Sequence, residues 1–436
     1  MRIVKVNKDS IANILSDLLK RSPTNYGDFQ DKVDAIIKNV RDNGDKAVFD
    51  YTAQFDKAEI NADNILVTEE EIKEAYEEVD DELIKVIRKA IKNIRDFHEK
   101  QIQKSWFETR EDGVMLGQKV TPMETCGVYV PGGKAVYPSS VLMNIVPAHV
   151  AGVKNIIMTT PPGKDGKVTA NTLVAAKEAG ATKVYKVGGA QAIAAMAFGT
   201  ESIPKVDKIV GPGNIFVALA KKAVYGNVSI DSIAGPSEIL VLADETANPR
   251  YVAADLLSQA EHDEMASAIL VTTSEELAHK VSDEIDGFLN QLSRKEIMEK
   301  SLDSFGYILV ASNMKEAIDT ANAIASEHME IMTANPFDVM TRIKNAGAIF
   351  IGAYSCEPLG DYFAGPNHVL PTNGTAKFFS PLSVDDFIKK SSIISYSREA
   401  LEPLSEDIQK FAKAEGLTAH ANSIRVRFEE DDDIKE

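Results

Sequence analysis

Short apolar runs alternate with helix-like segments from about residue 120 onward, and this alternation constrains the fold more than any other feature of the chain. In the first series, strands are expected at 155–160, 183–187, 208–210 and 228–231, with helices at 170–179, from 190, and at 215–224. A second series follows the turn at 234–237, with strands expected at 238–244, 268–272, 307–310 and 348–351, and helices starting at 249, at 275–292 and at 314–325. Parallel strands need a crossover connection, which is usually a helix. The sequence therefore predicts an α/β protein with two doubly wound, incomplete Rossmann-like domains.

Three of the expected strand ends carry glycine-rich turns that lead into helices: Gly132-Gly133, Gly188-Gly189 and Gly211-Pro212-Gly213. Glycine lets the backbone approach a ligand closely, and the N–H groups at the start of a helix bind phosphate. None of the turns completes the G-x-G-x-x-G dinucleotide motif, because Phe216 stands where the third glycine would follow Gly213. Tight turns in α/β proteins also need glycine, so the pattern leaves nucleotide binding and simple turn geometry open.

The composition excludes several classes of protein. The 436 residues carry a net charge of −18, which argues against binding to nucleic acid or to anionic membranes. The N-terminus lacks the apolar run of a signal peptide, and no stretch is long and apolar enough to span a membrane, so a cytoplasmic protein is expected. The two cysteines, Cys126 and Cys356, are not spaced as zinc ligands and cannot form a disulfide framework.

The two ends of the chain read as helical. Residues 1 to about 110 have helical spacing and many charges, which favours packing and surface roles, and His98 is expected to be exposed there. The tail from about 383 is expected to be helical and to fray at its acidic end, 429–436.

The helix that begins after Asn248 has polar residues on the side it should bury. Asn248 suits the cap and Pro249 the first position of this helix, while Val252, Leu256, Gln259 and His262 follow one another on one face. An amide and an imidazole on a buried face belong either to a satisfied core contact or to a metal or substrate site.

Four of the seven histidines lie at element ends or in loops with a carboxylate nearby: His262, His328, His368 and His420. The expected helix at 314–325 ends in Ser326-Glu327-His328-Met329-Glu330, so two of the histidines directly follow a glutamate. Gln259, His262, Asp361 and His420 would form an oxygen and nitrogen ligand set suited to Zn²⁺ or Mn²⁺. The long gaps between them leave their convergence open.

A set of motifs along the chain resembles the histidinol dehydrogenase family, a family of zinc enzymes that catalyse the last two steps of histidine biosynthesis. The motifs occur in the family's order over about residues 115–427, and they are Gly127-Val128-Tyr129-Val130-Pro131-Gly132-Gly133, Gly188-Gly189-Ala190-Gln191, Gly211-Pro212-Gly213-Asn214, Ala234-Gly235-Pro236-Ser237, Gln259-Ala260-Glu261-His262-Asp263, Ser326-Glu327-His328, Gly365-Pro366-Asn367-His368 and Gly416-Leu417-Thr418-Ala419-His420. Met329 stands where the family more often has leucine, which changes no chemistry.

The resemblance implies NAD-dependent oxidation of L-histidinol to L-histidine through L-histidinal, in two hydride transfers. It implies one Zn²⁺ per subunit of a homodimer, held by Gln259, His262, Asp361 and, from the partner subunit, His420. It also implies roles for three further groups of residues: proton transfer by Glu327 and His328; NAD contacts by Tyr129, Gln191 and Asn214; and substrate contacts by Ser237, Gln259, His262, His328, Asp361, Glu415 and His420. His368 is a further candidate for orienting the reacting end of the substrate.

The implied domains are a helical N-terminal arm at 1–25, a substrate and zinc domain at 26–128 and 239–382, an NAD-binding domain at 129–238, and a small C-terminal tail domain at 383–436 that completes the dimer and the site.

Three alternatives remain: a related zinc and NAD dehydrogenase of another small alcohol, a zinc hydrolase with Glu327 as its base, and a scaffold without catalytic activity. NAD binding separates the first two, and retained metal excludes the scaffold.

Overall fold

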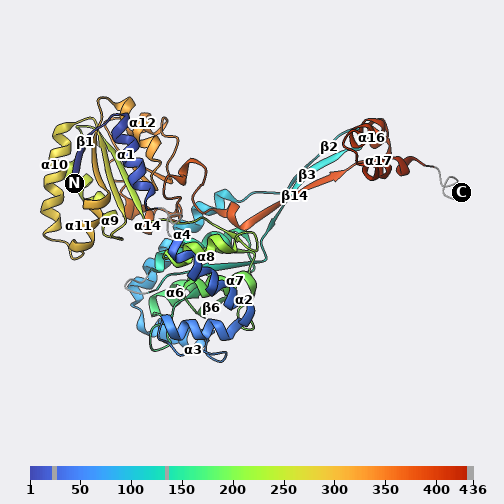
Figure 1. Cartoon of the computed structure of the whole chain (residues 1–436), viewed down its shortest axis with the longest axis horizontal. Coiled ribbons are helices and arrows are strands. Elements are labelled where there is room, and N and C mark those ends of the chain that lie inside the picture. The colour runs from blue at the N-terminus through green and yellow to red at the C-terminus, as the bar shows by residue number, and fades with distance from the viewer. Residues whose placement is uncertain (22–26, 133–136, 430–436) are drawn as a thin grey trace. The chain divides into compact units, whose positions relative to one another are not determined.

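The computed structural model describes residues 1–21, 27–132 and 137–429 (Figure 1). The predicted turn residue Gly133, the acidic end at 430–436 and the predicted boundary at residue 25 lie outside the described residues. By its contacts the chain forms two units: Met1–Ile102 with Met123–Phe387, and Gln103–Pro122 with Ile388–Glu436.

The first sheet of the larger unit has five parallel strands in the order β6-β5-β4-β7-β8. Its strands are β4 Thr125–Tyr129, β5 Asn155–Thr160, β6 Lys183–Lys186, β7 Lys208–Val210 and β8 Ser229–Ile230. The chain starts in the middle strand β4, adds β5 and β6 on one side, and then returns to add β7 and β8 on the other. The carboxyl ends of β4 and β7 therefore form a topological switch point, where doubly wound sheets bind ligands.

Helices cover both faces of this sheet. They are α2 Gly27–Phe55, α3 Glu69–Glu78, α4 Asp81–His98, α5 Pro138–Ala151, α6 Ala170–Ala179, α7 Gly189–Phe198 and α8 Ile215–Val224. The apolar sides of α3, α4, α5 and α6 share one core cluster, and those of α2, α7 and α8 share another. This packing differs from the predicted grouping of residues 26–128 with 239–382, because the apolar stripes of α2 and α4 are buried on the helices of the first sheet. Strand β4 also crosses the predicted boundary at 128/129.

The second sheet of the larger unit has six parallel strands in the order β1-β11-β10-β9-β12-β13. Its strands are β1 Arg2–Lys5, β9 Glu238–Ala243, β10 Ser267–Thr272, β11 Gly306–Val310, β12 His328–Met332 and β13 Ala348–Ile351. Its helices are α1 Lys8–Leu19, α9 Pro249–Ala260, α10 Glu275–Leu289, α11 Lys295–Phe305, α12 Met314–Ile324, α13 Pro336–Met340 and α14 Glu357–Tyr362. One core cluster holds residues of α9, α10 and α11, and another holds residues of α1, α12 and α13. Both sheets are parallel and doubly wound, which confirms the predicted fold class.

The predicted helical arm begins with a strand. Residues Arg2–Lys5 form β1 and pair in parallel with β11, and only then does α1 start. The extended run Arg2-Ile3-Val4-Lys5 supplies the β-branched residues that the edge of the sheet favours.

The prediction that His328 lies at the end of a helix is wrong, because β12 begins at this residue. Helix α12 stops at Ala325, whose φ of 55° is left-handed, and the chain then enters the sheet between β9 and β13. Along β12, polar His328 and Glu330 alternate with Met329 and Ile331, which is the two-residue period of a strand. The polar residues kept this segment from being predicted as a strand, because a buried parallel strand usually consists of apolar residues throughout.

Two further predictions about histidines need correction. Helix α9 ends at Ala260, so His262 lies in the turn that follows and not on the helix face. His98 is fully buried instead of exposed, because α4 turns this side inward and Gln101 provides a hydrogen-bond partner for its ring at 2.7 Å.

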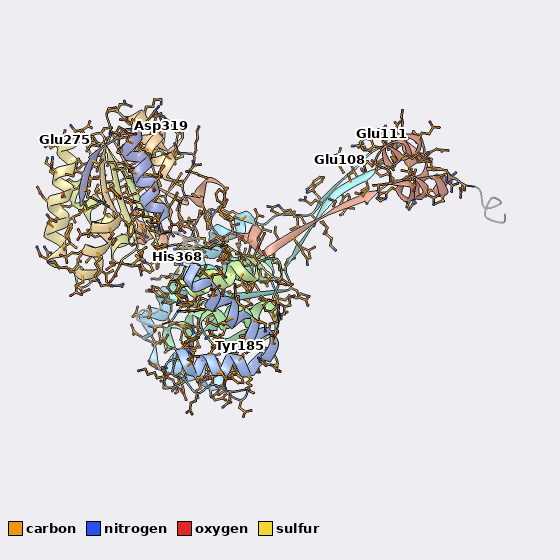
Figure 2. The ribbon with its side chains drawn as sticks, viewed as in Figure 1. Glu108, Glu111, Tyr185, Glu275, Asp319 and His368 are labelled. Atoms are coloured by element: carbon orange, nitrogen blue, oxygen red, sulfur yellow. The ribbon has the colours of Figure 1, made fainter. Side chains whose placement is uncertain are left out.

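The smaller unit is an antiparallel sheet with short helices. The sheet has the order β14-β3-β2, with β2 Trp106–Thr109, β3 Met115–Pro122 and β14 Ile388–Ser395, and the helices are α15 Arg398–Leu401, α16 Ser405–Ala414 and α17 Thr418–Arg425. Strand β2 carries Glu108, which Figure 2 labels. The tail is therefore not helical from 383 as predicted, because residues 388–395 pair along the whole of β3. Within the described ranges, no helix is long and apolar enough to cross a membrane.

Candidate functional site

The amino ends of β9 and β12, neighbouring strands of the second sheet, bring Glu327 and His328 together. The backbone N–H of Glu238, the first residue of β9, donates to Glu327 Oε2 at 2.8 Å. The carbonyl oxygen of the same residue lies 3.0 Å from His328 Nδ1. A single residue of β9 therefore orients both side chains that the sequence predicts for proton transfer.

Arg21 fixes Glu238 from a distant part of the sequence. Its buried guanidinium donates to Glu238 Oε1 at 2.9 Å and to the carbonyl of Pro236 at 3.0 Å. Breaking a buried pair of this kind by removing one partner costs about 3–5 kcal/mol. Arg21 thus holds the turn that contains Ser237, the predicted substrate contact just before β9. The sequence analysis missed Arg21, since nothing local distinguishes it from other basic residues of the N-terminal region.

The hydrogen bonding of His328 defines which ring nitrogen is free to react. Nδ1 faces a carbonyl oxygen, which only accepts, so this nitrogen carries the proton. Nε2 is buried and has no hydrogen-bond partner among the described residues, although Asp361 Oδ1 lies 3.7 Å away. In the neutral ring, Nε2 is therefore the atom that can accept a proton from a bound molecule.

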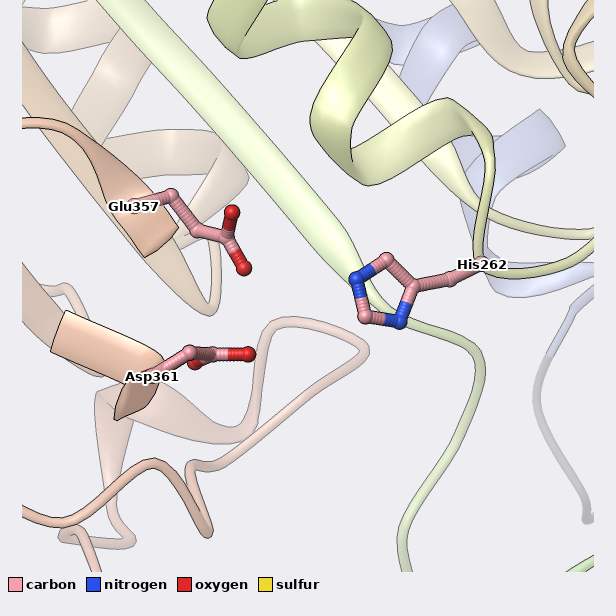
Figure 3. Close-up of side chains that lie close together, drawn as sticks. All are labelled: His262, Glu357 and Asp361. Carbon is pink, nitrogen blue, oxygen red and sulfur yellow. The ribbon is translucent and has the colours of Figure 1, made fainter. Parts of the chain in front are cut away.

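His262, Glu357 and Asp361 form a group that could hold a metal ion (Figure 3). Each offers a ligand atom, and these atoms lie within 4.8 Å of one another. The turn after Ala260, at the end of α9, therefore lies close to α14, which carries Glu357 and Asp361. Glu357 was not predicted, although its spacing of four residues from Asp361 places both carboxylates on one face of α14.

Gln259 supports a metal at this group. Its side chain is 1% exposed, and its Oε1 atom has no hydrogen-bond partner in the part of the chain that the structure describes. A buried amide oxygen without a donor is costly unless a ligand satisfies it. Together with an imidazole and carboxylates, it gives the oxygen and nitrogen donor set that suits Zn²⁺.

The charges of the group shift its pKa values strongly. Burial alone would raise the pKa of Asp361, but His328 and His368 hold it well below its usual range. Burial lowers the pKa of His328, yet the Glu327 and Asp361 carboxylates outweigh this and raise it to about 10. Burial raises the pKa of Glu327 to about 8 despite His328. Desolvation lowers the pKa of His262, which favours the neutral imidazole that a metal ion binds.

His368, labelled in Figure 2, belongs to the same group of charges. Its Nδ1 lies 3.6 Å from Asp361 Oδ1. The preceding residue, Asn367, donates to the carbonyl of Met143 at 2.6 Å. That carbonyl lacks its usual helical donor because Pro147, four residues on in α5, has no N–H. The buried amide of Asn367 thus anchors the loop that carries His368.

Two further buried carboxyl groups support α14. Glu330 Oε1 accepts from the backbone N–H of Glu357 at 2.8 Å, and Asp255 contacts the Glu330 carboxyl group. Two carboxyl groups in hydrogen-bond contact share a proton, since a carboxylate has no donor. Burial raises the pKa values of Glu330 and Asp255, which favours this protonated pair. The sequence analysis assigned no role to either residue.

The predicted NAD residues lie at the carboxyl edge of the first sheet. Tyr129 ends β4, and its buried hydroxyl accepts from the backbone N–H of Gly189 at 3.1 Å. Burial raises the pKa of Tyr129 to about 12, so the phenol stays protonated. Gln191, in the first turn of α7, is buried, and its Oε1 has no partner among the residues described. Asn214 caps α8 and accepts from the N–H groups of residues 216 and 217.

A cavity of about 720 Å³ lies at the same edge, beyond β4 and β5. Its lining includes Asp56, Pro131, Gly132, Thr160, Pro161 and Gly163. Asp56 Oδ2 is buried and unpaired within the described ranges, and burial raises the pKa of Asp56 to about 6.

The remaining two predicted residues lie in the smaller unit. Glu415 follows α16, His420 is on α17, and both are exposed. The larger unit therefore brings together Gln259, His262, Glu327, His328 and Asp361, while the roles of Glu415 and His420 stay predictions.

Comparison with known proteins shows the family to which the chain belongs. The sequence profile of the family described as histidinol dehydrogenase matches residues 19–428. Histidinol dehydrogenase of Clostridium acetobutylicum is 61% identical over 393 residues, which are 90% of this chain and 91% of that protein. The enzyme of Bacillus subtilis is 59% identical over 425 residues, covering 97% of this chain and 99% of its own. A crystal structure of histidinol dehydrogenase from Elizabethkingia anophelis superposes with a TM-score of 0.92 at 39% identity, covering 98% of both chains. The chain belongs to the histidinol dehydrogenase family and is an oxidoreductase of histidine biosynthesis.

Proposed function

We propose that the chain oxidises L-histidinol to L-histidine through L-histidinal, with two molecules of NAD and with a requirement for zinc. The observation that carries the proposal is the buried Nε2 of His328, which has no hydrogen-bond partner among the described residues and lies beside Glu327 and the group that could hold a metal. One group of residues can then accept protons while its neighbours hold the substrate.

Gln259, His262 and Asp361 would hold the zinc ion, with His420 of the partner subunit as a fourth ligand. Gln259 Oε1 lacks a hydrogen-bond partner in the described part of the chain, the lowered pKa of His262 favours its neutral form, and the lowered pKa of Asp361 favours the carboxylate; all three fit this role. When bound, the metal supplies open positions for the imidazole and amine nitrogens of histidinol. A cation at Asp361 would also offset the part of the raised pKa of His328 that comes from Asp361, and would so favour the neutral ring whose Nε2 accepts a proton.

His328 would accept the hydroxyl proton of the substrate at Nε2 in the first oxidation. Glu238 keeps the ring in the tautomer that leaves Nε2 free. The aldehyde must take up water before a second hydride can leave, and Glu327 is the base for that water. After releasing the first proton to solvent, His328 would accept the hydroxyl proton of the hydrated aldehyde in the second oxidation.

NAD, which accepts the hydride in each step when bound, would lie at the carboxyl edge of the first sheet. Tyr129, Gln191 and Asn214 would contact it there, at the ends of β4, β6 and β7. The Gln191 Oε1 atom, which has no hydrogen-bond partner among the described residues, supports this location. The cavity of about 720 Å³ lies at the same edge, but it is lined by the neighbouring loops and not by these three residues. In doubly wound sheets, dinucleotides bind at this edge, near the switch point.

The substrate would further contact Ser237, Glu415 and the metal ligands, and a homodimer would bring Glu415 and His420 to the site of the partner subunit. The smaller unit exposes large apolar side chains on its strands and helices, including Phe107, Ile394 and Phe411, at 66%, 72% and 72%. Such a surface on a small unit supports burial against a second copy.

The test is the number of NADH molecules formed per histidinol consumed. Two per substrate, lost with a chelator and restored by added zinc, is the expected result. One NADH per substrate with released histidinal would refute the two-step reaction. Activity that persists in a metal-free preparation would refute the zinc requirement.

A further inference from the structure

The backbone of the turn after β7 lies in close contact with the end of β4. Gly211 follows directly after Val210 and has a φ of 116°, which side chains rarely tolerate. A Cβ atom at this position would lie 2.0 Å from the carbonyl oxygen of Tyr129. The backbone of Gly211 therefore sets the distance between two of the predicted NAD-binding segments, the end of β4 and the turn that leads to Asn214.

One buried ion pair holds both polar groups of the Gly211 backbone. The N–H of Gly211 donates to Asp231 Oδ2 at 2.8 Å, and its carbonyl oxygen accepts from Lys221 Nζ at 2.9 Å. Lys221 and Asp231 also pair with each other, and their side chains are 2% and 4% exposed. Lys221 comes from α8 and Asp231 follows β8, so the pair connects two neighbouring elements to the turn.

Stability alone does not explain a charged pair at this place. Removing two charges from water is costly, and well-packed apolar residues often replace a buried ion pair without loss of stability. Apolar side chains could not, however, bind the N–H and the carbonyl of Gly211. The particular contribution of the pair is therefore the fixed position of this peptide.

We propose that Lys221 and Asp231 are positioning residues for the dinucleotide, which act by holding Gly211 so that Asn214 and Tyr129 face one ligand at the correct separation. This inference rests on the proposed use of NAD. Neither residue needs to touch the dinucleotide, because both act through the turn.

The test replaces the pair by apolar residues in the double variant Lys221→Met, Asp231→Leu. We expect a folded protein with wild-type zinc content and an unchanged KM for histidinol. The KM for NAD and the Kd for NADH, measured by fluorescence, should each rise about tenfold, as expected when two buried hydrogen bonds to the turn are lost. Unchanged NADH affinity in the folded double variant would overturn the proposal.

A matched control lies at the other end of the same strand. Lys208, the first residue of β7, forms an ion pair with Asp386 at 2.9 Å, and its side chain is 6% exposed. Lys208→Met removes an ion pair from β7 without touching Gly211, so the NADH affinity should stay at the wild-type level. An equal loss of NADH affinity in this control would assign the effect to general destabilisation and would also overturn the proposal.

The single variant Asp231→Asn keeps the test decisive if the double variant does not fold. The amide retains an acceptor for Gly211 but weakens the pair with Lys221, so the KM for NAD should rise by less than in the double variant while the KM for histidinol stays constant. Equal changes in both KM values would refute a role in positioning. The wild-type protein separates this inference from the proposed function: if it does not reduce NAD, the proposed function itself fails.

Discussion

Replacing Glu327 by glutamine separates the two oxidations that the site is proposed to perform. The carboxylate accepts from the backbone N–H of Glu238 at 2.8 Å, and a glutamine oxygen can accept the same hydrogen bond. The side chain is 9% exposed, so the substitution keeps the volume and the packing of a buried position. The free energy of unfolding should therefore change by no more than about 1 kcal/mol.

The chemical effect of Glu327→Gln should be much larger than the structural one. Loss of a general base lowers a rate by about 10²–10⁴-fold, which corresponds to about 3–5 kcal/mol of activation free energy. This loss should fall on the oxidation of histidinal, which needs activated water, while oxidation of histidinol should slow by less than about tenfold. Single-turnover measurements of NADH formation, started from each substrate in turn, give the two rates directly.

Glu330→Gln is a suitable control for Glu327→Gln. Glu330 is also a buried glutamate that accepts a backbone N–H, and it lies three residues further along the chain, on β12. Because it acts through the position of α14, its replacement should change both oxidation rates by a similar factor. Equal losses for the two substrates in Glu327→Gln would refute the assignment of Glu327 to the aldehyde step.

Four further substitutions test other parts of the site. His328→Asn should slow both oxidations by about 10²–10⁴-fold while zinc content is retained, and a normal rate of either step would contradict its role as proton acceptor. His262→Asn should lose zinc on dialysis, as measured by atomic absorption; full retention would disprove the metal assignment. Arg21→Met should lower the free energy of unfolding by about 3–5 kcal/mol, because it leaves the Glu238 carboxylate buried without a counter-ion. The added change Glu238→Gln should recover most of that loss in urea titrations. Burial raises the pKa of Asp56 from 3.8 to about 6, so the native protein loses stability as the pH rises from about 4 to 6. The stability of Asp56→Asn relative to the wild type should therefore increase over this window and stay constant above it. Parallel Tm profiles of the two proteins against pH would contradict the shift.

The sequence predicted the α/β architecture well because the buried strands of both sheets are apolar and short. Helix α8 and strand β13 lie at the predicted residues, since the change of apolar period marks their ends. Strand β12 was missed for a physical reason that concerns the site itself. Its buried His328 and Glu330 break the apolar pattern, and those are the polar side chains that the site places in the sheet.

The residues that orient the site could not be predicted from local pattern. Arg21 lies more than two hundred residues before Glu238, and its contact depends on how α1 packs against the second sheet. The Glu330 contact with the backbone of α14 depends in the same way on the fold. Motifs therefore indicated candidate reactive side chains, whereas the contacts that hold these side chains required the structure.

A short connection joins the edge of the first sheet that is proposed for NAD to the edge of the second sheet that carries the proposed proton-transfer residues. The chain leaves the carboxyl end of β8 in the first sheet and enters the amino end of β9 in the second through residues 231–237. A connection of this length keeps the two edges less than about 30 Å apart. The chain enters the second sheet at its amino edge, where Glu327 and His328 lie, whereas ligands of doubly wound sheets usually bind at the carboxyl edge.

Each end of this connection is held by a buried ion pair. Asp231, paired with Lys221, binds the turn at Gly211, and Arg21, paired with Glu238, binds the carbonyl of Pro236. One pair therefore fixes the edge proposed for NAD, and the other fixes the residue that orients Glu327 and His328. Because hydride transfer depends steeply on the distance between donor and acceptor, a connection anchored at both ends would provide the fixed geometry that the two proposed oxidations require.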